Sequence, residues 1–470
     1  NNPNNFILSQ VMLEEETDIN DLSNLSIANG EIIKSYQFSD GLGRSIQDVL
    51  LKGSTGLKDV VSFYEYDEFG RMPKYFLPFT ADTPVSEADY LRSDPLADQQ
   101  AFYASLQGKG ITGNDVSQQA FSANIDFEDA PLNRVLEQTH TGANWSNKPV
   151  TVDYRANTTA DAVHDFRQGQ RNSHIFAAGA LYVTESTDED LNLSRSFTDK
   201  LGRTIMVERE LDGDKVRTYV IYDDFHNVTA IVPPQVAEDM RLANDWNIYH
   251  IKNFRRIYAY HYDDRQRPVT EYQPGGGTTS FYYNKLDLPV MSEDNNGNKI
   301  ITKYDILNRP ILTGYYKGNR VPADDFAAVV YETPDNSTHN YTLNNSFPTD
   351  VAGNLEIHTV LYYDDYDFDE DGTNEVNYLN PPDTDYKSTA STWTRNRVTS
   401  SKTGILNAIG GTTTFLSEHI HYDERGRVIQ VQSDNHLSGQ DLYYNRYNFT
   451  GWLLESHALA RRNGCVRREK

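Results

Sequence analysis

Residues 66–71 read Tyr-Asp-Glu-Phe-Gly-Arg, and related segments recur along most of the chain. The shared pattern is an aromatic residue, an acidic or amide residue, two variable residues, a turn-forming residue and, in most copies, Arg. Asp and Asn favour type I turns because their side chains accept hydrogen bonds from backbone amides further along the chain. The clearest copies begin at Phe38, Tyr66, Phe197 and Tyr422, looser ones at Tyr222, Tyr262 and Tyr304, and degenerate ones at Tyr283, Tyr363 and Tyr447.

The residue three positions after the acidic or amide residue indicates the kind of turn. In nine of the ten copies it is Gly, Asn, Asp or His, which tolerate a positive φ, and Gln266 is the exception. A type I turn followed by a left-handed residue makes a three-residue hairpin loop with a bulge. Each copy therefore predicts a β-hairpin. The ten positions are Gly43, Gly70, Gly202, His226, Gln266, Asp287, Asn308, Asp367, Gly426 and Gly451.

The composition favours sheets over a thick globular core. Hydrophobic residues make up 38% of the chain, whereas about 45–50% is usual, yet aromatic residues reach 12% and include 31 Tyr. Tyrosine suits strands with one packed and one wet face, since its ring is buried while its hydroxyl stays hydrated. Two-stranded units cannot each bury a core and gain stability by stacking. We therefore predict an all-β fold of stacked hairpins.

Length and charge exclude several classes of protein. The 470 residues and 53.5 kDa suffice for two to four domains or one extended repeat array. Lys and Arg total 43 and Asp and Glu total 68, so 43 − 68 gives a net charge of −25, which opposes nucleic-acid binding. No run of apolar residues is long enough to predict a transmembrane helix. The single cysteine, Cys465, rules out an internal disulfide framework and a cysteine-based zinc site.

The distribution of hairpin segments predicts three regions. Residues 1–150 form an N-terminal module with two hairpins and, at 80–130, a small insert that is partly helical around Leu96–Leu106. Residues 151–455 form the hairpin array, with loop insertions near 317–350 and 367–410 that are rich in Asn, Asp, Pro, Ser and Thr. Residues 456–470 are basic and poor in aromatic residues, so we expect a truncated or irregular tail.

The repeated segments resemble the YD repeats of the RHS family. That family occurs in bacterial polymorphic toxins, in the encapsulating part of insecticidal toxin complexes and in animal teneurins. Residues 35–44, 64–71 and 131–137 further resemble the module that opens RHS proteins of Bacteroidetes. The resemblance covers nearly the whole chain. Two family features are not found in the sequence: an Asp-Pro-x-Gly-type self-cleavage segment, and a recognisable toxin or sorting domain after the last repeat.

The resemblance implies a spiral of β-hairpins that forms part of a hollow shell. In the relatives, the shell encloses a C-terminal toxic or variable segment, and Bacteroidetes relatives are commonly exported by the type IX secretion system. It therefore implies a bacterial protein that is secreted or displayed on the cell surface. The implied partners are a toxin or cargo segment in cis or a separate shell partner, together with the secretion machinery.

One acidic segment, at residues 367–375, has the spacing of a calcium loop. Asp367, Asp369 and Asp371 occupy positions 1, 3 and 5, a Gly follows at position 6, and Glu375 occupies position 9. Oxygen ligands at this spacing suit a hard cation, although Tyr378 stands where an EF-hand has its bidentate Glu. The alternative is a solvated acidic turn on an inserted loop. If calcium binds, we expect it to stiffen the insertion. No other cofactor is expected.

No motif predicts catalysis. The sequence contains no HExxH, GxSxG or P-loop segment. His419 and His421 alternate along one strand and could share a metal, but they stand at aromatic positions of the repeat and are better explained as structural. The Arg that follows each turn is also interpreted as structural. It can pair with the Asp of its own or the neighbouring hairpin and so fix the stacking register, although exposed pairs contribute only about 0–1 kcal/mol each.

These observations favour a non-catalytic shell-wall segment of a secreted or cell-surface RHS protein, with a cargo that is not in this chain. The alternative is a surface adhesin or glycan-binding protein that uses exposed aromatic residues on loops, such as Trp393. A glycan-active enzyme with paired carboxylates is the least favoured hypothesis, since no site converges in the sequence.

Overall fold

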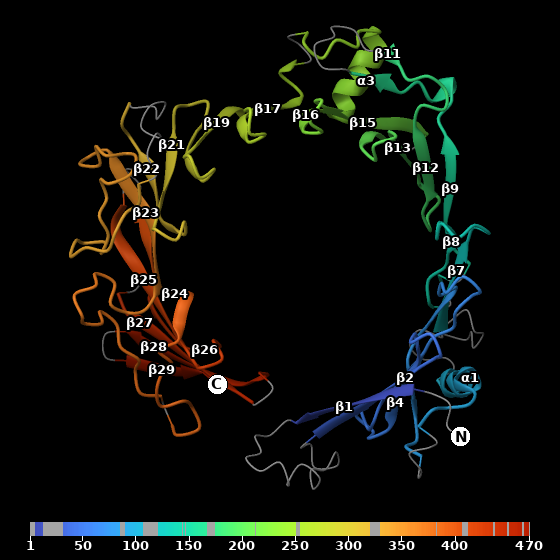
Figure 1. Cartoon of the computed structure of the whole chain (residues 1–470), viewed down its shortest axis with the longest axis horizontal. Helices are drawn as coiled ribbons and strands as arrows, with labels where there is room; N and C mark the ends of the chain where they lie inside the picture. The colour runs from blue at the N-terminus through green and yellow to red at the C-terminus, as the bar shows by residue number, and fades with distance from the viewer. Residues whose placement is uncertain are drawn as a thin grey trace. The chain divides into compact units, whose positions relative to one another are not determined.

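The computed structural model describes residues 5–12, 32–84, 90–106, 121–142, 144–145, 147–166, 174–211, 213–250, 254–319, 330–381, 383–406, 412–435, 438–448, 451–462 and 465–469. Antiparallel strands dominate these residues, which confirms the predicted all-β hairpin fold (Figure 1). The chain divides into two compact units. Unit 1 comprises residues 1–223 and 231–254, and unit 2 comprises residues 224–230 and 255–470.

Unit 1 contains fifteen described strands and both described α-helices. Its elements are β1 (Asn5–Met12), β2 (Ile32–Ser39), β3 (Ser45–Leu50), β4 (Asp59–Phe63), β5 (Lys74–Phe76), β6 (Phe79–Ala81), α1 (Pro95–Ser105), β7 (Ser122–Phe127), β8 (Val135–Gln138), β9 (Val150–Ala156), β10 (His164–Asp165), β11 (His174–Ile175), β12 (Tyr182–Thr187), β13 (Leu193–Thr198), β14 (Thr204–Leu211), β15 (Asp214–Tyr222) and α3 (Pro234–Ala243). The chain passes between the units three times, after residue 223, after residue 230 within β16 (Val228–Val232), and after residue 254.

Two antiparallel arrangements make up most of unit 1. Strands β1, β2, β3, β4 and β6 form a five-stranded sheet in that order. Strands β5, β7, β8, β9, β12, β13, β14 and β15 then pair successively. Each strand therefore shields the polar edge of its neighbour, as a hairpin array requires.

Helix α1 confirms the partly helical insertion and covers the core of the five-stranded sheet. Asp94 caps it by accepting a hydrogen bond from the amide of Ala97 at 3.0 Å, and Pro95 opens the first turn. Tyr103 packs among the sheet's buried aromatic residues and donates its hydroxyl to the carbonyl of Pro78 at 2.9 Å. The insertion thus supplies apolar cover that the thin sheet lacks by itself.

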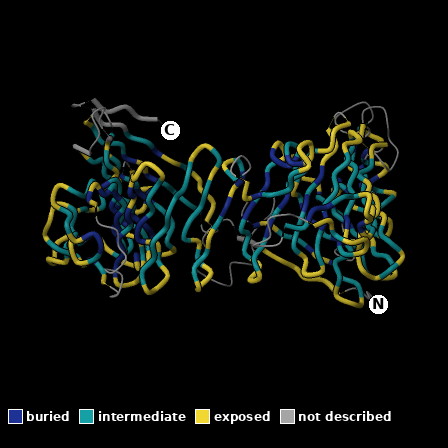
Figure 2. The backbone as a smooth tube through the Cα atoms, turned by 90° about the horizontal axis from the view of Figure 1, so that it is seen from above, coloured by how far each residue is buried: buried dark blue, intermediate teal, exposed yellow. Residues whose placement is uncertain are grey.

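Unit 2 is an uninterrupted antiparallel run in which each strand pairs with the next. Buried residues lie along its strands, whereas exposed ones concentrate at turns and inserted loops (Figure 2). Its strands are β17 (Tyr258–Tyr262), β18 (Pro268–Gln273), β19 (Gly277–Tyr283), β20 (Pro289–Glu293), β21 (Lys299–Tyr304), β22 (Pro310–Tyr316), β23 (Leu355–Asp364), β24 (Thr394–Leu406), β25 (Thr412–Tyr422), β26 (Val428–Asp434), β27 (Gln440–Tyr447), β28 (Leu453–Arg462) and β29 (Cys465–Glu469).

A buried ion pair joins the segment between β22 and β23 to strand β21. Lys303 Nζ on β21 lies 2.8 Å from Glu332 Oε1, and both side chains are fully buried. The same ammonium group donates to the carbonyls of Ser346 and Pro348. Burial lowers the pKa of Lys303, whereas that of Glu332 is lowered by Lys303 against the effect of its own burial. The described part of this segment contributes Tyr341 and Phe347 to the hydrophobic core of the unit.

Three features differ from the expectations of the sequence. Within the loop insertion expected at 367–410, residues 394–406 form β24, because the chain returns to pair with β23 over a long register. The irregular tail expected at 456–470 instead continues β28 and forms β29 over 465–469, because ladder pairing uses backbone groups and does not need the aromatic pattern. Helix α3 has no counterpart in the predicted hairpin array; two prolines begin it, and Asn244 ends it in a left-handed conformation.

Candidate functional site

The side-chain oxygen of the Asp or Asn organises the repeat turns, as the turn at Asp40 and the turn at Asn284 illustrate. Asp40 Oδ1 accepts hydrogen bonds from the backbone amides of Leu42 and Arg44, both at 2.9 Å, and its Oδ2 accepts from Arg44 Nε at 2.7 Å. The bond from the Arg44 amide is the largest of the contacts that hold the pKa of Asp40 below its usual value. The same pairing of Arg Nε with Asp Oδ2, at 2.6–2.8 Å, occurs in the turns Asp67–Arg71, Asp199–Arg203, Asp263–Arg267, Asp305–Arg309 and Asp423–Arg427.

The left-handed residue of each turn is present in nine of the ten copies. Its φ ranges from 62° at Gln266 to 95° at Gly451. Gln266 therefore adopts the predicted conformation despite its residue type. The copy that departs from the pattern is the one at Tyr363, because Asp367 has no positive φ.

That copy is completed by residues from the far side of an insertion. Asp364 Oδ1 accepts a hydrogen bond from the amide of Asn396, which is left-handed with φ 64°, and Thr394 Oγ1 donates to the carbonyl of Asp364. Arg397 then occupies the Arg position. Residues 365–393 are thus an insertion inside a repeat turn, which the sequence pattern alone cannot reveal because the two halves are separated along the chain.

In the eight repeats that begin with Tyr, the Tyr hydroxyl joins its hairpin to the preceding one. Tyr66 donates its hydroxyl to the carbonyl of Ser45 at 2.8 Å, and Ser45 directly follows the Arg of the previous turn. The equivalent hydrogen bonds, at 2.7–3.2 Å, run from Tyr222 to Thr204, Tyr262 to Val228, Tyr283 to Pro268, Tyr304 to Pro289, Tyr363 to Pro310, Tyr422 to Val398 and Tyr447 to Val428.

The Arg of each turn also lies over the aromatic ring of the next repeat. The Arg44 guanidinium carbon is 4.3 Å from the centre of the Tyr66 ring, and that of Arg309 is 4.3 Å from the Tyr363 ring. Corresponding contacts of 4.6–5.3 Å join Arg203 to Tyr222, Arg267 to Tyr283, Arg397 to Tyr422 and Arg427 to Tyr447. We call this set of Tyr hydroxyl and Arg contacts the hairpin lock. These contacts join each hairpin to the next and so set the spacing between neighbouring hairpins.

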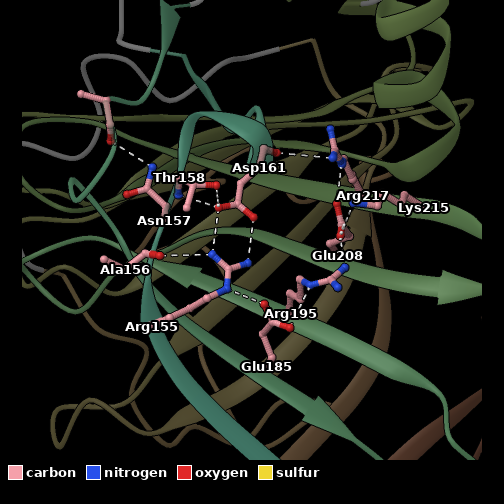
Figure 3. A network of polar contacts seen from close by, with 11 residues as sticks. Arg155, Ala156, Asn157, Thr158, Asp161, Glu185, Arg195, Glu208, Lys215 and Arg217 are labelled. Atoms are coloured by element: carbon pink, nitrogen blue, oxygen red, sulfur yellow. Dashed lines mark hydrogen bonds and ion pairs between the residues drawn. The ribbon is translucent and has the colours of Figure 1, made fainter.

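A row of alternating charges crosses four strands of unit 1 (Figure 3). Glu185, Arg195, Glu208 and Arg217 lie on β12, β13, β14 and β15 and are direct cross-strand partners. Arg195 Nη1 is 2.6 Å and Arg217 Nε is 2.8 Å from the carboxylate of Glu208, whose side chain is only 2% exposed. Although burial raises the pKa of Glu208, the hydrogen bonds from the two Arg side chains lower it overall. All four charges are satisfied within the sheet, which indicates a structural role.

The row continues to a short helical turn beside β9. Arg155 donates two hydrogen bonds to Asp161, at 2.8 and 2.9 Å, and a third to Glu185. The hydrogen bond from Arg155 is the main cause that lowers the pKa of Asp161 to about 2. The sequence analysis missed this network. The signal that could have found it is the alternation of acidic and basic residues at in-register positions of successive strands.

The structure brings together three of the four proposed calcium ligands. Asp367, Asp369 and Glu375 each offer a carboxylate oxygen, and these atoms lie within 4.8 Å of one another. Asp371 is oriented differently, since its Oδ1 accepts hydrogen bonds from the amide and hydroxyl of Thr373. Its backbone amide donates to Asp367 Oδ1 at 3.0 Å, so Asp371 shapes the loop around the cluster.

The histidines and the exposed tryptophan occupy separate environments. His421 is 1% exposed, and its ring is stacked 4.4 Å from that of Tyr366. His419 Nδ1 is 2.8 Å from Ser400 Oγ. Neither belongs to a cluster of metal-ligating side chains found among the described residues. Trp393 is 78% exposed on the insertion that precedes β24.

Comparisons with known proteins give one domain match and a similarity of fold. Residues 10–158 match the family described as a domain of unknown function, DUF6443. The structure is similar to the Tc holotoxin pore of Photorhabdus luminescens that carries a TccC3 mutation, with a TM-score of 0.50 and 12% identity over 98% of this chain and 19% of that one. It is also similar to TcdB2-TccC3 without its hypervariable C-terminal region, with a TM-score of 0.48 and 13% identity over 93% of this chain and 19% of that one.

These comparisons bear on fold and family. The domain match covers residues 10–158 of the 470, and the similarity to the holotoxin structure, at 12% identity, concerns the fold. This chain spans about a fifth of the solved chains that it matches. No curated protein matches the sequence. Neither α1, with 11 residues, nor α3, with 10, has the length and apolar character needed to cross a membrane.

Proposed function

We propose that this chain is a non-catalytic wall segment of a hollow shell in a secreted or cell-surface RHS protein. The hairpin lock carries this proposal, because a Tyr hydroxyl and an Arg side chain join successive hairpins at a fixed spacing. Such contacts between neighbouring hairpins can stabilise a sheet that is one layer thick without a thick core. The fold similarity to a toxin-complex structure supports the same proposal.

The finer parts of the proposal rest on the sequence resemblance. We place the protein in the Bacteroidetes group of RHS proteins, with export through the type IX system and a distant relation to teneurins. Its partner is a toxin or cargo segment, either in cis or carried by a separate shell partner. The absence of catalysis in this proposal likewise rests on the sequence, in which no catalytic motif was recognised.

Protease protection of the natural full-length protein tests the shell. We expect the segment that follows this chain to resist a protease concentration that cuts the same segment when it is produced alone. Tyr363→Phe removes one hydroxyl of the hairpin lock and should increase the cutting rate. Tyr443→Phe, at a 41% exposed position outside the lock, is the matched control. Equal cutting of the free and the attached segment would contradict a shell.

We further propose that the loop at residues 367–375 binds calcium through Asp367, Asp369 and Glu375, with Asp371 holding the loop in shape. The convergence of three carboxylate oxygens within 4.8 Å supports this. We expect a dissociation constant of about 10⁻⁴–10⁻³ M, as in extracellular calcium modules. Calorimetric titration should show binding that Asp369→Asn abolishes and that Asp383→Asn, in the same insertion, leaves unchanged. No heat of binding from the unaltered protein at millimolar calcium would refute the site.

A further inference from the structure

The residue just before the left-handed position is large, apolar and exposed in six of the repeat turns. It is Leu or Phe in these turns, and its exposed fraction runs from 43% at Leu286 to 80% at Leu42. The other four are Phe69, Leu201, Phe225 and Leu307. Turns are usually built from Gly, Asn, Asp, Ser and Pro. The apolar side chains therefore serve either the turn itself or a contact outside it.

The geometry of the turn does not require an apolar residue at this position. The turn between β20 and β21 has the same geometry, since Asp294 Oδ1 accepts from the amides of Asn296 and Asn298, both at 2.8 Å, and Gly297 is left-handed with φ 79°. Asn296 stands there at the position that Leu307 has in the next turn of the chain. Because a polar residue fits this turn equally well, the exposed Leu and Phe residues point to a contact outside the turn.

The apolar turns of unit 2 lie together at one edge of its sheet. Each strand is antiparallel to the next, so every second turn lies at the same edge, and the turn at Asp294 lies at the opposite edge. The repeat turns after β15, β17, β19 and β21 share one edge, about 9–10 Å apart, because two strands separate each turn from the next. We call their exposed tips the rim of unit 2, which comprises residues 224–226, 264–266, 285–287 and 306–308.

The rim has its most exposed apolar residues at its two ends and most of its charges in the middle. Phe225 is 67% exposed in the first turn, and Ile306 and Leu307 are 74% and 56% exposed in the fourth. Asp264 lies in the second turn and Lys285 in the third, and both are exposed. The other charged residues of the rim are Asp224, beside Phe225, and the pair Arg265 and Asp287, which are joined at 2.7 Å within the chain.

This order is complementary to itself about a two-fold axis. In a two-fold contact, each residue faces the counterpart of its own partner. An axis between the second and third turns brings the first turn against the fourth turn of another copy, and the second against the third. Phe225 then meets Ile306 and Leu307, and Asp264 meets Lys285. Moving the axis by half a turn spacing would instead place Asp264 or Lys285 against the same residue of the other copy, where like charges repel.

We propose that the rim of unit 2 binds the rim of a second copy of this chain in a closed two-fold dimer. The apolar ends supply the hydrophobic contact, and the opposite charges in the middle set the register. The equal spacing of the turns in both copies lets the four tips meet together. This dimer goes beyond the shell role and does not depend on it.

Analytical ultracentrifugation of the 470-residue chain over a range of concentrations tests the proposal. We expect a monomer–dimer equilibrium with no larger species, because a two-fold contact closes on itself. Phe225→Asn/Leu307→Asn removes apolar contacts at both ends of the interface and should raise the dissociation constant about tenfold or more. Asn is the residue that the matching turn carries at Asn296, so both turns should keep their geometry. The matched control is Leu211→Asn, at a 62% exposed position outside the rim, which should leave the dissociation constant unchanged.

A charge exchange tests the register and does not depend on the apolar variant folding. Lys285→Glu places a carboxylate against Asp264 of the other copy and should weaken the dimer. Asp264→Lys/Lys285→Glu makes the facing charges opposite again and should restore it. A chain that stays monomeric, assemblies larger than a dimer, an unchanged dissociation constant in Phe225→Asn/Leu307→Asn, or a charge exchange that restores nothing would overturn the proposal.

Discussion

At the scale of single residues, the Arg of the repeat is shared between two hairpins. Arg309 forms an ion pair with Asp305 of its own turn at 2.7 Å and another with Asp364 of the next turn at 2.7 Å, and it lies over the ring of Tyr363. Its side chain is only 17% exposed. A partly buried Arg with bidentate contacts contributes more than an exposed surface pair.

We therefore expect Arg309→Ala to lower the free energy of unfolding of unit 2 by about 1–3 kcal/mol. Urea denaturation followed by tryptophan fluorescence and circular dichroism measures this. The matched control is Arg265→Ala, because the Arg265 side chain is 57% exposed and pairs with Asp287 at the turn surface. Its effect should stay within about 0.5 kcal/mol, and equal losses in the two variants would refute the special role of the repeat Arg.

At the scale of elements, turn chemistry was predictable and long-range contacts were not. The left-handed positions followed from residue types such as Gly43 and Asn308, and the Arg–Asp pairing followed from their spacing of four residues. The insertion inside the turn at Asp364 could not be recognised, because Asn396 completes that turn from 32 positions away. For the same reason, three of the proposed calcium ligands could be identified from local spacing, whereas the stacking of Tyr366 on His421, which joins the insertion to another strand, could not.

The buried ion pair between β21 and the following segment gives an element-scale prediction. Lys303→Met leaves the carboxylate of Glu332 buried without its partner, so we expect a loss of about 3–5 kcal/mol in the free energy of unfolding. The double variant Lys303→Met/Glu332→Leu should recover much of this loss, because no unpaired charge remains. Thermal and urea unfolding of the variants measure both effects.

A surface pair in the same unit provides the control. Lys317 lies 2.9 Å from Glu356, but its side chain is 48% exposed, so Lys317→Met should cost less than about 1 kcal/mol. A double variant no more stable than Lys303→Met would show that the loss comes from packing and not from the unpaired charge.

At the scale of the whole molecule, each unit contains a buried histidine that links stability to pH. Burial is the main cause that lowers the pKa of His164 in unit 1, and of His421 in unit 2, to about 4 from a usual 6.5. Above pH 6.5 both rings are neutral in folded and unfolded chains. As the pH falls from 6.5 to 4, only the unfolded chain takes up the protons, so the folded state loses stability.

Each histidine should cost up to about 2–3 kcal/mol over that interval, with no further loss from these groups below pH 4. Melting temperatures recorded from pH 7 to pH 4 should fall and should do so less in His164→Phe, which retains an aromatic ring against Trp246. An identical pH dependence in that variant would contradict the assignment.

Electron cryomicroscopy of the natural full-length protein is the most direct test of the proposed shell. We predict that the hairpins of this chain form part of a continuous wall around an internal space, with the Tyr and Arg contacts of the hairpin lock joining neighbouring hairpins. Hairpins arranged as an open sheet with both faces in solvent, or packed around a solid core, would contradict the account.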